Sequence, residues 1–191
     1  FSSGSTCVAL LRPMPCRLFI FVATIALICS ASFGQKVPEG FKSELIMQVP
    51  EIEHPSVVTC DDEGNLFVGE DPMDMRGPTT EPIDRVIYLR WSDDGGPPKK
   101  TVFCDGLSAV FGLVWYDDAL YVMHAPYYSV FRDTDGDGVA DERKDLAEGF
   151  GPPAGVFGFN DHIVTGTRLG LDGLVYVSVG DKGIQRATGA D

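Results

Sequence analysis

The sequence has few cysteines, few basic residues and only one long apolar run. Its five cysteines form neither a CxxC nor a CxxCH motif, which excludes a cysteine zinc knuckle and a covalent haem site within these 191 residues. Lys and Arg number 15 against 28 Asp and Glu, so the net charge is −13. This balance disfavours nucleic acid and anionic membrane surfaces as partners. The apolar run, Leu18–Cys29, is shorter than the roughly 20 residues that a membrane-spanning helix needs.

The apolar run belongs to an N-terminal segment with the order of a secretory signal peptide. Residues 1–13 show no pattern and are expected to be an untranslated or disordered leader before Met14. A basic residue, the apolar run and small residues follow, which predicts a signal peptide over 14–34 and a mature chain that begins at Gln35. We expect a secreted or periplasmic protein, membrane-associated only if this segment stays uncleaved. The mature part would carry 13 basic and 28 acidic residues, a net charge of −15.

Two cysteines, Cys60 and Cys104, lie in the mature part. They could form a disulfide in an oxidising compartment, or each could be buried as a small apolar residue. The sequence leaves both alternatives open.

The mature part consists of short β-type runs separated by Gly, Pro and Asp, and it contains no convincing amphipathic helix. An acidic turn followed by a Leu-aromatic-Val strand occurs three times, at Asp61–Glu70, Tyr116–His124 and Leu171–Asp181. The aromatic positions are 54 and 55 residues apart, at Phe67, Tyr121 and Tyr176. A repeat of this length is typical of a propeller blade with inserted loops.

A second repeat alternates with the first. It runs from Arg85–Leu89 to Val102–Leu107, and again from Ser129–Phe131 to Leu146–Phe150. Two out-of-phase repeats predict four-stranded antiparallel blades, because inner and outer strands each recur once per blade. We therefore predict an all-β fold in which residues 35–191 form about the first three blades of a β-propeller. A β-sandwich is the alternative.

Pro72–Pro82 is predicted to be a long loop projecting from the first blade. Such a loop could line a site or be an ordinary surface insertion.

One acidic stretch has the spacing of a calcium-binding loop. Counting from Asp133, carboxylates occupy positions 1, 3 and 5 and glycine occupies position 6. The predicted ligands are Asp133, Asp135, Asp137, the carbonyl of Val139, Asp141 and Glu142. Position 12 is Lys144 instead of glutamate, so Asp141, Glu142 or Asp145 must complete the shell. A solvated Asp/Gly turn is the alternative, but three carboxylates at close range repel one another and favour a cation.

Three histidines are present, and one has carboxylates on either side. His54 precedes Pro55 in a loop before the first strand, and His124 lies at a strand end; each could face a central channel or be an ordinary polar cap. Asp161 directly precedes His162, and Asp181 follows at the end of the next strand. Carboxylates can orient an imidazole and tune it as a proton acceptor, so His162 is the candidate base.

The segment around this histidine resembles the glucose/sorbosone dehydrogenase family of soluble quinoprotein propellers. The matching residues are His162, Arg168-Leu169, Asp172-Gly173, Tyr176 and Gly180-Asp181-Lys182-Gly183. The resemblance implies that His162 accepts the proton of a sugar hydroxyl while pyrroloquinoline quinone takes the hydride, with Asp181 holding the histidine. Arg168 lies two residues later than the arginine of the sugar enzymes. Those enzymes also place a glutamine where this chain has Ser108-Ala109-Val110.

Most of the mature chain also resembles large secreted bacterial propellers described as membrane-bound dehydrogenases. The matching stretches include Gly40-Phe41, His54-Pro55, Asp133–Asp141, Gly149–Gly151 and Asp161–Gly189. That resemblance implies a haem-binding CxxCH domain further along the polypeptide, whereas the expected sugar or related alcohol substrate follows from the resemblance to the quinoprotein propellers. The alternatives are a non-catalytic carbohydrate- or protein-binding propeller and a module that docks a haem domain.

Overall fold

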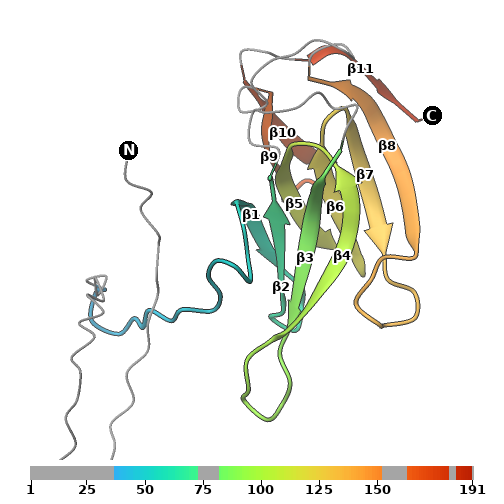
Figure 1. Cartoon of the computed structure of the whole chain (residues 1–191). Helices are drawn as coiled ribbons and strands as arrows, with labels where there is room; N and C mark the ends of the chain where they lie inside the picture. Colours follow the sequence, from blue (N-terminus) through green and yellow to red (C-terminus); the bar gives the residue numbers. More distant parts are fainter. Residues whose placement is uncertain (1–36, 73–81, 152–162, 181–183, 191) are drawn as a thin grey trace, which may run out of the picture. The chain divides into compact units, whose positions relative to one another are not determined.

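The structure, a computed structural model, describes residues 37–72, 82–151, 163–180 and 184–190. The chain divides into two units, residues 1–51 and 52–191. Of the first unit, residues 37–51 are described; they contain two turns, closed by Phe41 N–H to Pro38 O at 3.1 Å and Glu51 N–H to Gln48 O at 2.8 Å. The strands all belong to the second unit, and no described residue is helical (Figure 1).

The strands form three antiparallel sheets. Their bounds are β1 (Pro55–Cys60), β2 (Leu66–Glu70), β3 (Asp84–Arg90), β4 (Lys99–Leu107), β5 (Val110–Tyr116), β6 (Ala119–His124), β7 (Tyr127–Arg132), β8 (Glu142–Phe150), β9 (Val164–Leu169), β10 (Val175–Val179) and β11 (Ile184–Gly189). The first sheet has the order β1-β2-β3-β4. The second sheet has β5-β6-β7-β8 with β11 beyond β8, and the third sheet is the pair β9-β10.

The all-β prediction is confirmed, and the two sequence repeats correspond to strand positions. The three aromatic residues Phe67, Tyr121 and Tyr176 lie on β2, β6 and β10, each the second strand of its sheet. The alternating repeat supplies the third and fourth strands, β3-β4 and β7-β8. Apart from β11, each sheet is therefore a meander of strands that follow one another in the chain.

β11 departs from the predicted four-stranded unit because it adds a fifth strand to the second sheet. It pairs with the outer edge of β8 through Ile184↔Phe150, Thr188↔Glu148 and Gly189↔Ala147. Gly149 makes this approach possible: its φ is +91°, and a Cβ there would lie 1.8 Å from the carbonyl oxygen of Arg186.

Apolar cores fill the spaces between successive sheets. Phe67 and Tyr88 of the first sheet pack against Leu113 and Val122 of the second, and Phe67 stacks on Trp115 at 5.2 Å. Met123 and Tyr128 of the second sheet share a core with Val164 of the third sheet. Each fully buried side chain of this size contributes roughly 1.5–3 kcal/mol to stability.

The first strands lie side by side, β1 against β5 and β5 against β9. A glycine permits each close approach. A Cβ at Gly69 would lie 2.8 Å from the side chain of Val110, and a Cβ at Gly112 would lie 2.7 Å from that of Thr167. Ser56 Oγ also donates to Val110 O at 2.5 Å, which joins the first two sheets directly.

Corresponding strands of the sheets begin at the same end of the second unit. Ala109, Ala125 and Ile163 pack together next to the beginnings of β5, β7 and β9. The β3–β4 and β7–β8 loops both lie towards the opposite end of the sheets (Figure 1). No helix among the described residues is long and apolar enough to cross a membrane.

Cys60 and Cys104 do not pair. Both are free thiols; Cys60 is exposed, whereas Cys104 is half-buried and packs against the core between the first two sheets. The predicted loop Pro72–Pro82 lies largely outside the described residues.

Candidate metal centre

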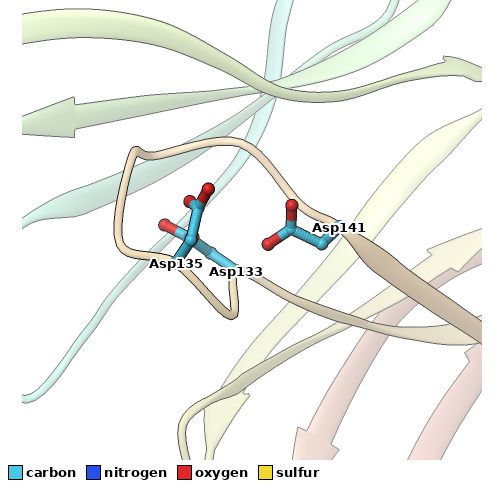
Figure 2. A group of neighbouring side chains, drawn as sticks. All are labelled: Asp133, Asp135 and Asp141. Carbon is cyan, nitrogen blue, oxygen red and sulfur yellow. The ribbon is translucent and has the colours of Figure 1, made fainter.

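The acidic loop connects β7 to β8 and brings three of the predicted ligands together. Asp133, Asp135 and Asp141 each offer a carboxylate oxygen within 4.8 Å of the other two. Figure 2 shows Asp133 and Asp135 on one side of the loop and Asp141 reaching toward them from the other. Two oxygens on one calcium ion, each bonded at 2.3–2.6 Å, are at most about 5 Å apart, so the observed spacing suits a single ion.

Backbone amides of the loop hold Asp133 in place. Its Oδ1 accepts from Gly136 N–H at 2.7 Å and its Oδ2 accepts from Gly138 N–H at 2.8 Å. Gly138 has a φ of +95°, which favours glycine at the sharp turn. The predicted position 6 of the loop therefore makes the turn that the spacing requires.

Asp141 closes the loop from its far side. Its Oδ2 accepts from Thr134 N–H at 2.7 Å and from Thr134 Oγ1 at 2.9 Å. These bonds, the backbone bond first, lower the pKa of Asp141. Asp141 is therefore charged and fixed in position at neutral pH, as a cation ligand must be.

The other predicted carboxylate ligands do not join the group of three. Asp137 Oδ1 accepts from Val139 N–H at 2.7 Å, which engages that carboxylate within its own turn. Glu142 begins β8 opposite Arg132. Asp145, the alternative for completing the calcium shell, lies further along β8 and accepts hydrogen bonds from Ser129 and Arg143.

Of the candidate catalytic residues, only Arg168 is described. It lies on β9 opposite Tyr176 of β10, is exposed, and donates from Nη1 to Thr167 O at 2.8 Å. Both side chains line a cavity of about 670 Å³, together with Ser56 of β1 and Phe111 of β5.

Asp161, His162 and Asp181 lie outside the described residues. Their sequence neighbours are described: Gly180 N–H donates to Ile163 O at 2.6 Å, which continues the pairing of β9 with β10.

His124 belongs to a buried polar chain that sequence reasoning missed. Its Nε2 lies 2.8 Å from Ser129 Oγ, and Ser129 Oγ donates to Asp145 Oδ1 at 2.6 Å. Because the serine hydrogen points to the carboxylate, Nε2 carries the proton that the serine accepts. Arg143 Nε also donates to Asp145 Oδ1, at 2.8 Å, and the guanidinium lies over the ring of Tyr127.

This series of hydrogen bonds is structural, since Ser129 is fully buried and lies between the Asp145 carboxylate and the His124 imidazole. Burial lowers the pKa of His124 to about 3; the charge of Arg143 acts in the same direction and that of Asp145 opposes it. The sequence offered one signal for the contact between His124 and Ser129: the short connection from β6 to β7 places these two residues close together. Asp145 comes from β8 and could not be assigned without the sheet. His54, by contrast, is exposed just before β1.

Two fully buried carboxylates at one end of the first sheet were also missed. Glu70 accepts from Glu53 N–H at 2.7 Å and forms an ion pair with Arg85. Asp84 accepts from Ala109 N–H at 2.5 Å. Each carboxylate accepts a hydrogen bond from the backbone of a segment that connects strands. These bonds explain why the carboxylates are buried, and no ligand is needed to account for them.

Residues 31–191 match the family described as Domain of unknown function (DUF7133). The chain belongs to this family. The match includes all three sheets and the acidic loop. No curated protein and no solved structure matches the chain.

Proposed function

We propose that this chain is the calcium-binding N-terminal part of a secreted β-propeller dehydrogenase that oxidises a sugar or related alcohol. The observation that carries the calcium assignment is the convergence of Asp133, Asp135 and Asp141 in a loop with calcium-type spacing. The role of the ion is structural, because the loop joins two neighbouring strands and lies at the opposite end of the sheets from the beginnings of β5 and β9.

Calcium titration tests this assignment. We expect binding to raise the melting temperature and EDTA to reverse the rise; calcium at about 100 times its Kd would add about 2.7 kcal/mol to the free energy of unfolding. Asp135→Asn should weaken calcium binding at least tenfold. Asp93→Asn, which removes one exposed carboxylate from the β3–β4 loop, is the matched control and should bind as the wild type does. No calorimetric signal at millimolar calcium would reject the site.

Three features support a propeller for the sheets. Two four-strand meanders follow each other, their first strands lie side by side, and a tight glycine contact recurs at each interface. On the third sheet, a Cβ at Gly166 would meet only the Ser178 hydroxyl, at 3.3 Å, and Tyr176 is 56% exposed. A further blade would cover this face. In a polypeptide extended by its natural downstream sequence, Tyr176 should become protected from iodination; equal reactivity in both would contradict the propeller.

The dehydrogenase assignment rests on the resemblance of the segment around His162. In it, His162 is the base, Asp161 and Asp181 orient it, and Arg168 is a further candidate catalytic residue. Pyrroloquinoline quinone, when bound, would supply the hydride acceptor.

The described residues fit this anionic cofactor in part. Arg168 lines the 670 Å³ cavity and donates a hydrogen bond to the backbone carbonyl of Thr167. Ser108, Ala109 and Val110 are buried and provide no amide side chain. Any quinone contact from that segment therefore differs from that of the sugar enzymes.

The activity test uses the full polypeptide with calcium and the quinone, and follows dye reduction on aldoses. We expect turnover in the wild type and a loss of at least 100-fold in His162→Ala. His54→Ala is the control for removing an imidazole. The absence of both quinone binding and turnover would favour the carbohydrate-binding alternative, and undiminished turnover in His162→Ala would reject the base.

A further inference from the structure

The acidic loop of the second sheet is docked on the first sheet. Ala140 N–H donates to Phe103 O of β4 at 2.8 Å. Arg90, at the end of β3, donates from Nη1 to Gly136 O at 3.0 Å. The loop therefore makes two hydrogen bonds to a sheet to which its own flanking strands do not belong.

Gly138 provides a third contact. It is buried, and a Cβ at this position would lie 3.4 Å from both the ring of Tyr88 and the hydroxyl of Thr101. Tyr88 is part of the core between the two sheets and donates its hydroxyl to Asp61 at 2.9 Å. The loop thus closes over the edge of the core.

The same glycine residues contact both the first sheet and a candidate ligand. Gly136 accepts from Arg90 through its carbonyl and donates to Asp133 through its amide. Gly138 packs on Tyr88 and likewise donates to Asp133. A change in the position of the Asp133 carboxylate must therefore move the residues that contact the first sheet.

We infer that ion binding in the loop 133–141 and docking of this loop on the first sheet are thermodynamically coupled, so that the ion fastens the two sheets to each other. The inference rests on the proposed calcium site. Without an ion, the three carboxylates repel one another and favour a wider loop. With an ion, the loop takes the narrow form whose Gly136, Gly138 and Ala140 match the first sheet.

Coupling is reciprocal, so weakening the docking contacts must weaken calcium binding even though no ligand is altered. Arg90→Met removes the bond to Gly136 and keeps the length of the side chain. We expect the calcium Kd to rise about 3- to 10-fold, the equivalent of losing one hydrogen bond. Simple electrostatics predicts the opposite sign, because removing a cation near an acidic loop should tighten calcium binding.

Lys99→Met is the matched control, since Lys99 lies directly opposite Arg90 in the ladder and carries the same charge. Its calcium Kd should stay unchanged or fall. Melting temperatures in EDTA check that both variants fold. Equal or tighter calcium binding by Arg90→Met would overturn the coupling and leave the calcium site intact, whereas no binding by the wild type would reject both.

Hydrogen exchange supplies a second measurement that needs no variant. The Ala140 amide, bonded to Phe103 O, should exchange at least 10-fold more slowly with calcium than with EDTA. The amide of Tyr121, in the middle of β6, is the reference and should change less. Equal protection factors at Ala140 in the two conditions would contradict the inference.

Discussion

Lowering the pH from 7.5 to 5 should destabilise the folded chain by about 2 kcal/mol through His124 alone. The imidazole is 2% exposed and donates to Ser129, and its burial keeps the folded-state pKa near 3. In the unfolded chain it returns to its ordinary value of 6.5. The folded pKa is thus the lower of the two, so this contribution is complete above about pH 6.5 and declines as the pH falls.

The magnitude follows from proton uptake. At pH 5 the unfolded imidazole is almost fully protonated and the folded one is neutral, so 1.5 pH units at 1.36 kcal/mol per unit give about 2 kcal/mol. Because pH 5 lies well above a pKa of about 3, the folded imidazole stays neutral over this whole pH range. The full difference, about 5 kcal/mol, is reached only below pH 3.

The assay is urea unfolding at pH 7.5 and pH 5, followed by tryptophan fluorescence, to which Trp115 contributes from its position against the core, and performed in EDTA to exclude calcium effects. His124→Gln retains a side-chain N–H donor for Ser129 but has no proton to gain. Its stability should fall about 2 kcal/mol less than that of the wild type between the two pH values. His54→Gln, at an exposed site, is the control. The same pH-dependent loss in His124→Gln and the wild type would refute the reasoning.

Two further predictions concern the sheet interfaces and the thiols. Gly112→Ala should cost about 1–3 kcal/mol, because its Cβ would lie 2.7 Å from Thr167, whereas Gly166→Ala should change stability by less than about 0.5 kcal/mol. Equal losses in urea unfolding would contradict the interface. Iodoacetamide should label Cys60 in the native chain and spare Cys104, whose pKa burial raises to about 12. Peptide mapping would show this, and equal labelling would disprove it.

Strand positions could be predicted because the residues that define them are local. An acidic turn and an alternating Leu-aromatic-Val run specify a strand whatever its neighbours are, so β2, β6 and β10 were found from Phe67, Tyr121 and Tyr176. β11 was not found, because its sequence has no alternating apolar pattern. Its pairing depends on Gly149, whose missing side chain matters only once Arg186 approaches.

The acidic loop was only partly predictable for a related reason. Spacing indicated that Asp133, Asp135 and Asp141 would converge, since those positions wrap round one point. It also suggested Asp137, but that carboxylate caps Val139 N–H two residues later, a local hydrogen bond that competes with convergence.

The buried hydrogen bonds that join His124, Ser129 and Asp145 could not be predicted, because these three residues come from three different strands. A histidine at a strand end is consistent with a channel, a cap or a core position. Ser129 and Asp145 decide among these only after β6, β7 and β8 are in register.

The meander topology has a consequence for biosynthesis. Each strand of the first sheet pairs with the strand that precedes it, so this sheet can form as soon as Leu107 has left the ribosome or a translocation pore, before the second sheet exists. The second sheet can follow on that template. β11 is the exception among the described strands: it must wait while the third sheet is made and then return to β8. Growth from one end, with one late closing strand, is therefore the assembly order that this topology permits.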